Sequence, residues 1–236
     1  MDNSSIEIID TGLKPYREVL DLQEQLFNAN IDARQRGEAT KNYLILCEHP
    51  PVFTLGKSGK RENILVSDAE LKAEFYKVNR GGDVTFHGPG QLVVYPILDL
   101  DSLHMGIAQY IFNIEETIIQ SLIPYHLKGE RIENAAGIWL RNNKDVPHDR
   151  KIGAIGVKAS RNITMHGLAF NINPDLSYFD KIVPCGLEGK GVTSLQKELK
   201  RAVDFVEYKQ AFLRSFHYVF NTNTTAEKSN RVKAKN

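Results

Sequence analysis

The feature of this sequence that most constrains its fold is a set of short strand-like segments, several of which follow one another without a helix between them. They are rich in β-branched or aromatic residues and are bounded by glycine, proline, asparagine or charged residues. They are YLILC (43–47), VFTL (52–55), FYKV (75–78), LVVYPIL (92–98), GIWL (137–140), IGAIGV (152–157) and HGLAFNI (166–172). A regular strand–helix alternation does not fit this order. The sequence therefore predicts an α+β domain with a mixed, largely antiparallel sheet flanked by helices.

Three segments have the spacing of apolar residues that is typical of an amphipathic helix. The clearest covers 107–123, and its apolar positions are Ile107, Tyr110, Ile111, Ile114, Ile118 and Leu122. A second runs from about Tyr16 to Arg34, and the residues expected to face the core are Val19, Leu22, Leu26 and Ile31. A third, near the end of the chain, aligns Phe205, Tyr208, Phe212 and Val219.

Local signals predict two shorter helices and one loop. Capping boxes at Ser67 with Glu70 and at Thr193 with Gln196 predict the starts of the helices. The polar stretch at 141–151 is expected to be a hairpin loop, because strand-like segments flank it closely on both sides.

Length and charge limit the class of protein. The 236 residues, 42% of them hydrophobic and 25% charged, favour one globular domain over 1–220, followed by a disordered polar tail over 221–236. No apolar run approaches the roughly 18 residues of a membrane span, and the first residues lack the pattern of a targeting peptide. The net charge of +1 lacks the strong positive field of a nucleic-acid-binding protein. We therefore expect a cytoplasmic protein without nucleic-acid or membrane partners.

The densest unusual segment is RGGDVTFHGPGQ at 80–91, which carries four glycines between two strands. Glycine tolerates positive φ and leaves backbone N–H groups accessible, so paired glycines beside Arg80 are suited to hold an anion or a carbonyl oxygen. The plainer alternative is a pair of tight turns, since Gly-Pro-Gly is turn chemistry wherever it occurs.

The two cysteines differ in their surroundings. Cys47 lies inside the apolar strand YLILC and is expected to be a buried small hydrophobe. Cys185 lies between proline and glycine, which favour an accessible loop, and it needs a nearby cation or base to become a nucleophile. By itself, Lys151 at the start of a strand is more simply explained as a solvated residue at a strand edge.

The sequence carries no recognisable metal-binding motif. His87 and His166 together with Cys185 have no spacing typical of zinc ligands, so we expect no metal and no cofactor. For His166, in TMHGLAF, the more plausible role is to orient a neighbouring loop or the substrate.

Four segments together resemble the lipoate-protein octanoyltransferases of the biotin/lipoate protein ligase and transferase superfamily. They occur in the family's order and cover most of residues 40–200. They are HPPVFTLGKSGKRENIL (49–65), RGGDVTFHGPGQLVVYPILDL (80–100), KIGAIGVKASRNITMHGLAFNI (151–172) and PCGLEGKGVTSL (184–195). The resemblance implies a catalytic domain of that superfamily's fold.

The resemblance also implies an activity and a site. The activity is transfer of an octanoyl group from octanoyl-acyl carrier protein to a lysine of apo lipoyl domains, in 2-oxoacid dehydrogenases and the glycine cleavage H protein, as the first step of lipoate synthesis. Cys185 would be the acyl-thioester nucleophile and Lys151 its partner. The acyl pocket would be lined by Arg80, Gly81, Gly82, Asp83, Val84, Thr85, Phe86, His87, Ala154, Ile155, Gly156, Gly167, Leu168 and Ala169.

Three other functions remain open at this stage. An ATP-dependent lipoate or biotin ligase would activate a free acid as an adenylate and would not need a cysteine nucleophile. A noncatalytic module that binds acyl carriers or lipoyl domains would use the same pocket and form no covalent adduct. A related amidotransferase would move octanoyl between two carrier domains through the same cysteine chemistry.

Overall fold

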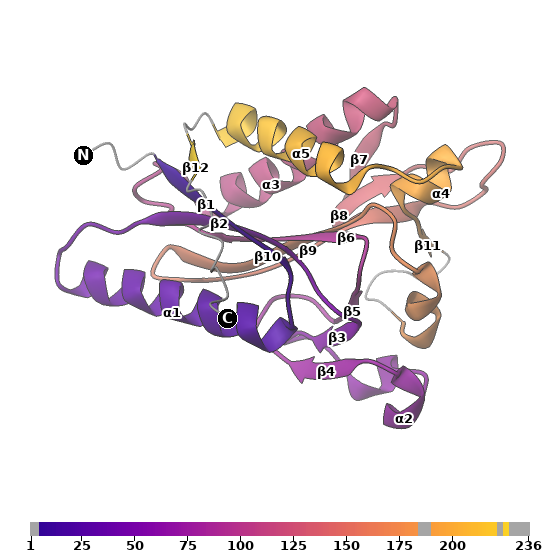
Figure 1. The fold of residues 1–236 in the computed structure, drawn as a ribbon, viewed down its shortest axis with the longest axis horizontal. Helices are drawn as coiled ribbons and strands as arrows, with labels where there is room; N and C mark the ends of the chain where they lie inside the picture. The colour runs from indigo at the N-terminus through magenta and orange to yellow at the C-terminus, as the bar shows by residue number, and fades with distance from the viewer. Residues whose placement is uncertain (1–4, 184–189, 221–223, 227–236) are drawn as a thin grey trace, which may run out of the picture.

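The computed structural model describes residues 5–183, 190–220 and 224–226. Its main element is a large sheet with the strand order β12-β1-β2-β6-β10-β9-β8-β7, to which β11 adds by pairing with β9 (Figure 1). In chain order these strands are β1 (Ile6–Leu13), β2 (Asn42–Glu48), β6 (Gln91–Ile97), β7 (Gly129–Ile132), β8 (Ala135–Leu140), β9 (Arg150–Ser160), β10 (Ile163–Asn171), β11 (Gly191–Val192) and β12 (Thr224–Ala226). The strands from β2 to β7 pair in antiparallel fashion, whereas β1 runs parallel to both its neighbours.

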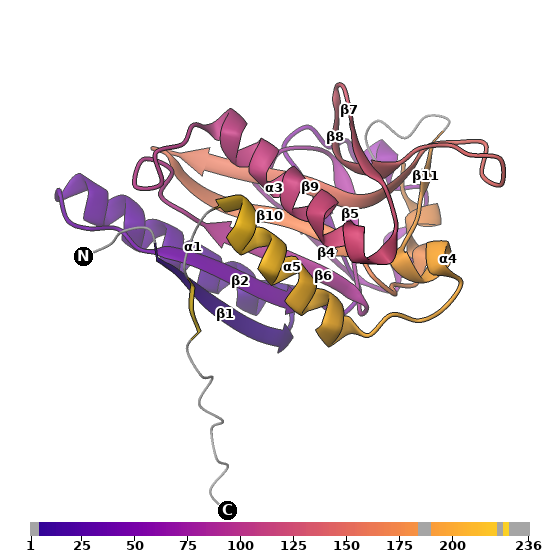
Figure 2. The same ribbon diagram turned by 90° about the horizontal axis from the view of Figure 1, so that it is seen from above.

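Helices cover both faces of this sheet. Helices α3 (Ile107–Leu122) and α5 (Phe205–Phe220) lie across one face, and α1 (Tyr16–Gln35) lies along the other (Figures 1 and 2). Side chains of β2 alternate accordingly, with Leu44 and Leu46 packed on the α3–α5 side and Ile45 and Cys47 on the α1 side. Burial on both faces explains why this strand reads as a continuous apolar run.

A second, three-stranded sheet lies beside the N-terminal end of α1 (Figure 1). Its order is β4 (Glu74–Lys77), β3 (Val52–Leu55), β5 (Val84–His87). Short helical segments complete the chain: η1 (Arg61–Asn63), α2 (Asp68–Leu71), η2 (Ile123–Tyr125), η3 (Leu176–Lys181) and α4 (Leu195–Leu199). The small sheet packs through Phe53 and Phe86 against η3, and this packing holds it over one end of the large sheet.

All seven predicted strands and all three long helices are present. The hairpin loop is also confirmed, since 141–149 joins the antiparallel strands β8 and β9. The sequence reading missed β1, β5, β7, β11 and β12. In β5, the four residues VTFH lie between glycine-rich turns, and only their pairing with β3 identifies them as a strand.

The predicted inner face of α1 is confirmed, although it is not the centre of the contact. Val19 is buried, and Leu22, Leu26 and Ile31 are half-buried and pack against the same core cluster. The centre of the contact is formed by Leu20, Gln23 and Phe27, so the helix is rotated toward a face that includes a polar side chain. The apolar periodicity alone did not show this, because glutamine and asparagine occupy two of the buried positions.

One of the two capping boxes was predicted correctly. Ser67 and Glu70 form the box at the start of α2. The second helix begins one residue later than predicted, because Ser194 is its N-cap and accepts a hydrogen bond from the Lys197 amide at 3.2 Å. Thr193 is instead held by the sheet, since its amide donates to the carbonyl oxygen of Lys151.

The predicted tail begins at residue 221, and only 224–226 of it fall within the described residues. They form β12, in which Thr224 lies opposite Ile6 of β1. Disorder of the remainder stays a prediction. In the part of the chain that the structure describes, no helix is both long enough and apolar enough to cross a membrane.

Candidate active site

A cavity of about 240 Å³ lies between the large sheet and the small sheet. Strands β9 and β10 form its floor, β5 and β6 contribute further walls, and α1 contributes Tyr16. Its lining is Tyr16, Arg80, Gly82, Asp83, Val84, Thr85, His87, Gln91, Val93, Tyr95, Asn134, Ala135, Ala136, Lys151, Ala154, Ile155, Gly156, His166, Gly167, Leu168, Ala169, Asn171, Phe179 and Val192.

Twelve of the fourteen predicted pocket residues line this cavity, and two do not. Phe86 points away from it and stacks on Tyr178, with ring centroids 4.4 Å apart. Gly81 uses its amide to bind the carbonyl oxygen of Val157 at 2.9 Å, which ties the glycine-rich segment to β9. The segment is therefore both a turn and a cavity wall, and the roles of its residues in binding stay predictions.

Arg80 is buried and its guanidinium is held by neutral oxygens. Its Nη2 donates to the carbonyl oxygen of Thr54 at 2.7 Å and to the hydroxyl of Thr54 at 2.9 Å, and its Nη1 donates to the carbonyl oxygen of Gly81 at 3.0 Å. Burial lowers the pKa of Arg80 from its ordinary value, because the charged form is desolvated. A guanidinium remains charged at any physiological pH, so it supplies positive charge to the cavity wall.

Two glycines make room for this arginine. Gly82 has a φ of +81°, a conformation that L side chains rarely adopt. At Gly156, in β9, an added Cβ would lie 2.9 Å from the carbonyl oxygen of Gly81 and 3.1 Å from Cδ of Arg80. The close approach of the segment to β9 therefore requires glycine at 156.

Hydrogen bonds with a defined direction run from Arg80 along the cavity wall. The amide group of Gln91 donates to the carbonyl oxygen of Phe86 and, at 2.9 Å, to Oδ1 of Asn171, so its Oε1 accepts from Nδ1 of His87 at 2.7 Å. The other ring nitrogen of His87 lies 3.5 Å from the hydroxyl of Thr54, which itself accepts from Arg80.

The same set of hydrogen bonds continues to the strand beside Lys151. Asn171 donates to the carbonyl oxygen of Thr193 at 2.9 Å, and the amide of Thr193 donates to the carbonyl oxygen of Lys151. The Thr193 hydroxyl donates to Glu198, which forms an ion pair with Arg150 at 2.5 Å. Buried polar groups thus connect the cavity wall to the backbone of Lys151.

A second polar group lies where α1 meets the cavity. Nδ1 of His49 donates to the carbonyl oxygen of Lys14 at 2.8 Å, so its Nε2 accepts from the hydroxyl of Tyr95 at 2.9 Å. Burial lowers the pKa of His49 and raises that of Tyr16 to about 12, although Arg80 opposes the rise for Tyr16. Both groups are therefore neutral near pH 7.

Cys47 is the buried small hydrophobe that the sequence predicted. It is 2% exposed, and its Sγ lies 3.7 Å from the carbonyl oxygen of Val93. Burial raises the pKa of this thiol well above its ordinary value, with Asp10 and Glu48 adding to the rise. A thiol in these surroundings is a poor nucleophile.

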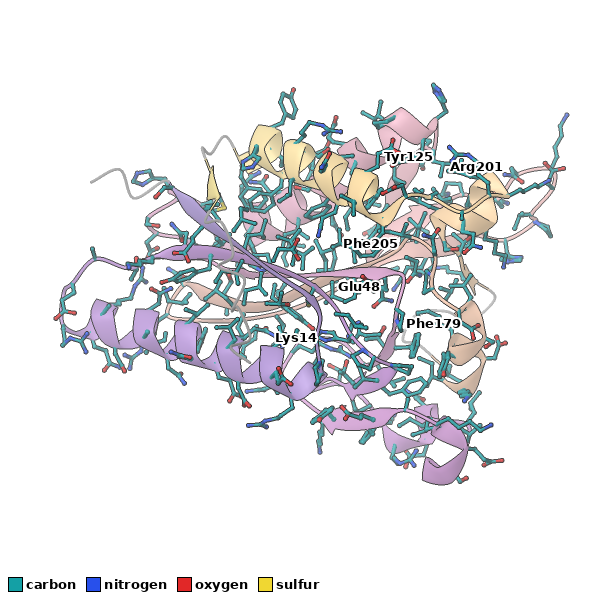
Figure 3. The ribbon with its side chains drawn as sticks, viewed as in Figure 1. Lys14, Glu48, Tyr125, Phe179, Arg201 and Phe205 are labelled. Atoms are coloured by element: carbon teal, nitrogen blue, oxygen red, sulfur yellow. The ribbon has the colours of Figure 1, made fainter. Side chains whose placement is uncertain are left out.

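Figure 3 labels one residue of the cavity lining, Phe179, and one residue of β2, Glu48. Phe179, from η3, lines the cavity from the side of the small sheet. The carboxylate of Glu48 accepts a hydrogen bond of 2.7 Å from the amide of Gly90, which fixes the Gly-Pro-Gly turn against β2 (Figure 3).

Lys151 lies at the start of β9 and lines the cavity. Its ammonium is 4.6 Å from the centroid of the Trp139 ring, and the ammonium of Lys190 is 4.9 Å from the same ring. Lys151 therefore lines the cavity, and its interpretation as a residue at a strand edge is wrong because strands pair with β9 on both sides of it. Cys185 lies outside the described residues, and its pairing with Lys151 stays a prediction.

His166 lines the cavity from β10. Burial, with the positive charges of Arg80 and Lys158, lowers its pKa to about 3. His87 also has a pKa of about 3, chiefly from burial and the nearby His49. Among the described residues, no three or more His, Cys, Asp or Glu side chains are arranged to hold a metal ion.

Several residues that line the cavity were not predicted from the sequence as pocket residues. Gln91 lies within the glycine-rich segment that was singled out, so its position there was a usable signal. The others are Tyr16, Val93, Tyr95, Asn134, Ala135, Ala136, Asn171, Phe179 and Val192. Val93, Tyr95, Asn171 and Val192 lie within the family segments quoted above, whereas the other five lie outside them, and only the fold brings those five to the cavity.

Comparison with known proteins gives a consistent result. The model of the lipoyl protein ligase A/B catalytic domain matches residues 15–217. The chain is 46% identical over 228 residues to the octanoyltransferase of Christiangramia forsetii, with 92% of this chain and 97% of that protein covered. It is 50% identical over 210 residues to the octanoyltransferase of Parabacteroides distasonis, with 87% and 94% covered.

Solved structures with the same fold are more distant in sequence. A putative lipoate protein ligase from T. acidophilum superposes with a TM-score of 0.66 at 16% identity, covering 94% of this chain and 88% of that one. A lipoate-protein ligase A bound with ATP gives 0.65 at 14% identity, covering 96% and 90%. These likenesses and the observed sheet order confirm the predicted α+β class.

Proposed function

The chain belongs to the lipoyl protein ligase A/B catalytic-domain family and is an acyltransferase that moves octanoyl groups in lipoate biosynthesis, and on this premise we propose that it works through a Cys185 thioester. The resemblance read from the four motifs is confirmed by the family match and by these relatives. The proposal concerns the route of the acyl group, its donor and its acceptors.

The observation that carries the proposal is the form of the cavity. Its floor is built from small and apolar residues of two neighbouring strands, Ala154–Gly156 of β9 and Gly167–Ala169 of β10. Lys151 lies three residues from Ala154 on the same strand. An extended hydrocarbon chain laid along these strands places its reactive carbonyl end beside an amine.

The proposed reaction has two transfers. The thiolate of Cys185 attacks the carbonyl carbon of the donor thioester, a new carbon–sulfur bond forms, and the thiol of the carrier protein leaves. The amine of an acceptor lysine then attacks the acyl-enzyme, an amide forms, and Cys185 is regenerated. The first transfer exchanges one thioester for another, and the second forms the more stable amide, so neither requires ATP.

Lys151 has a role in each transfer. As an ammonium it favours the thiolate form of Cys185, because opposite charges attract. As an amine it accepts the proton that the incoming lysine must lose. Backbone N–H groups of the glycine-rich segments are the donors that we propose for the tetrahedral oxyanion.

The donor and acceptors follow from this chemistry. We assign octanoyl-acyl carrier protein as the donor and apo lipoyl domains, of 2-oxoacid dehydrogenases and of the glycine cleavage H protein, as acceptors. The family implies an acyl donor and a lipoyl-domain acceptor in general. A cytoplasmic location suits such partners and stays part of the proposal.

An ATP-dependent ligase is the main alternative, because a lipoate-protein ligase with bound ATP has the same fold. Fold alone does not separate the two reactions. Relatives at 45–50% identity bear the name octanoyltransferase, which favours transfer from a carrier-protein thioester.

The test is the intact mass of the enzyme after incubation with octanoyl-acyl carrier protein alone. We expect one octanoyl adduct that hydroxylamine removes and that is missing in Cys185→Ala. Apo lipoyl domain should then discharge the adduct without ATP. Transfer that occurs only with donor and acceptor together, and without an adduct, would contradict the thioester route. Transfer from free octanoate that requires ATP would establish the ligase instead.

A further inference from the structure

The cavity has two ends that differ in exposure and in chemistry. At one end its lining includes Asn134 and Ala136, which are exposed to solvent. At the other end its lining includes Tyr16, His87 and His166, all of which are buried. The cavity is therefore open to solvent beside Asn134 and Ala136 and is closed by aromatic and imidazole rings where Tyr16, His87 and His166 line it.

The pairing of β9 with β10 sets the distance between these ends. His166 lies opposite Val157, which is six residues along β9 from Lys151. Six residues of strand span about 20 Å. A zigzag octanoyl chain with carbon–carbon bonds of about 1.5 Å spans about 9 Å, which leaves room for the lysine side chain and the reacting groups. A chain whose carbonyl carbon lies beside the amine of Lys151 directs its methyl end along the strands toward His166.

The backbone turns His166 into the cavity. In a regular strand, residue 166 would share its face with Leu168 and Phe170, which pack on the side of α3 and α5. His166 has a φ of +58° instead, and its ring interacts with the charges of Arg80 and Lys158 on the side of α1. Its amide donates to Oε1 of Gln23 at 3.1 Å, so α1 holds this unusual conformation in place.

The imidazole of His166 has an unused hydrogen-bonding position. It is 2% exposed, and its Nδ1 has no hydrogen-bond partner among the described residues. The side-chain nitrogen of Gln23 is likewise buried without a partner in that part of the chain. A buried polar atom that is left unpaired costs free energy, so contact with hydrocarbon at this point is unfavourable.

We propose that His166 ends the acyl-binding site and sets the longest acyl chain that the enzyme accepts. The inference rests on the proposed function, because it assumes that the acyl chain lies along β9 and β10 with its carbonyl carbon near Lys151. A chain of eight carbons stops short of the ring and leaves space for a water molecule to bind Nδ1. A longer chain meets the ring, displaces that water and leaves the nitrogen unpaired.

The test is a series of acyl-carrier proteins with six, eight, ten and twelve carbons. For the parent enzyme we expect kcat/KM to fall between eight and ten carbons. His166→Gly removes the ring and suits the positive φ, so it should raise the ten-to-eight ratio of kcat/KM at least about tenfold, which corresponds to about 1.4 kcal/mol. His166→Asn also tolerates this φ and should shift the ratio in the same direction. It therefore serves as the test if the glycine variant does not fold.

Val93→Ala is the matched control. Val93 lines the side of the same cavity, so its truncation should lower kcat/KM for all chain lengths by similar factors. An imidazole NMR signal of His166 that shifts on acylation with octanoyl but not with hexanoyl would support the proposal without any substitution.

Two failures can be told apart. A parent that transfers no octanoyl group at all refutes the proposed function. A parent that transfers octanoyl, but whose chain-length profile is unchanged in folded His166→Gly or His166→Asn, refutes the role of His166 alone. The same holds if the His166 signal responds equally to both acyl groups.

Discussion

Nδ1 of His87 lies 2.7 Å from Oε1 of Gln91, and this contact decides which imidazole nitrogen carries the proton. The amide of Gln91 has its own acceptors in Phe86 and Asn171, so its oxygen faces His87. The ring is therefore neutral with its proton on Nδ1, and its Nε2 faces Thr54 as an acceptor.

Gln91→Glu should change the charge of this histidine. A carboxylate beside the ring favours the imidazolium, so the pKa of His87 should rise from about 3 toward its ordinary value of 6.5. Titration of the imidazole signals by NMR measures this rise. In Gln91→Leu the pKa should stay low, while the unpaired N–H lowers the free energy of unfolding by about 1–3 kcal/mol. An unchanged titration in Gln91→Glu would show that the contact is not made.

Acid should destabilise the folded protein before most carboxylates titrate. His87 and His166 bind protons near pH 6.5 when unfolded and near pH 3 when folded, so the unfolded state binds more protons between these values. Stability is complete above about pH 6.5 and falls as the pH drops toward 3. Each histidine should remove about 2 kcal/mol between pH 6.5 and 5.0.

Urea unfolding at pH 7.5 and 5.0 measures this loss. His87→Gln should reduce the difference between the two values, whereas His104→Asn, at an exposed position, should leave it unchanged. Equal stability of the parent at both values would mean that these histidines are not buried in neutral form.

The two cysteines should respond differently to replacement. Cys185→Ala should abolish transfer, because the proposed nucleophile is lost. Cys47→Ala should keep most of the activity, since this thiol is buried with a raised pKa, and should cost about 1 kcal/mol of stability from lost packing. Acyl-transfer assays and thermal unfolding of both variants measure these effects. Equal loss of activity in both variants, with both folded, would contradict the assignment of Cys185 as the nucleophile.

Lys151→Ala should lower the rate of transfer roughly 10²–10⁴-fold, which is the usual contribution of a positioned acid or base. Lys190→Ala is the matched control, because both ammonium groups lie over the Trp139 ring, and its effect should stay below about tenfold. Alkylation of the enzyme by iodoacetamide across pH provides a second readout. Identical profiles for the parent and Lys151→Ala would contradict the pairing with Cys185.

Gly156→Ala should impair the site while the fold remains. The new Cβ would approach the Gly81 carbonyl oxygen and the Arg80 side chain, so the glycine-rich segment must move away from β9. We expect kcat/KM to fall at least about tenfold for a shift of this kind. Gly106→Ala meets no atom within 4 Å and should behave like the parent. Parent-like kinetics of Gly156→Ala would separate the segment from acyl binding.

Burial on both faces made most strands readable from the sequence. The runs YLILC and LVVYPIL are apolar throughout because helices cover both sides of β2 and β6. Strand β1 was missed because its residues IEIIDTGL mix apolar, acidic and glycine positions and most remain partly exposed. Its identity as a strand depends on parallel pairing with β2, which local sequence does not encode.

Motifs predicted the residues of the cavity better than its geometry. The segments around Arg80, Ala154 and Gly167 were recognised as one site only through the family resemblance, and twelve of their fourteen residues line one cavity. The positions of Lys151 and His166 relative to each other in the cavity were not predictable, because they depend on the β9–β10 register and on the positive φ of His166. The pairing of Gln91 with His87 likewise depends on a turn that places residues four apart face to face.

The pairing of Ile6 with Thr224 has a consequence for synthesis of the protein on the ribosome. Strand β1 is made first, yet Ile6 belongs to the same apolar cluster as Phe216 and Phe220 of α5, and the neighbouring strand β12 is made later still. A nascent chain that ends before α5 lacks the aromatic side chains that pack with Ile6 in this cluster. Completion of this cluster must therefore wait until α5 has been synthesised, and until then the exposed apolar surface is a natural target for chaperones.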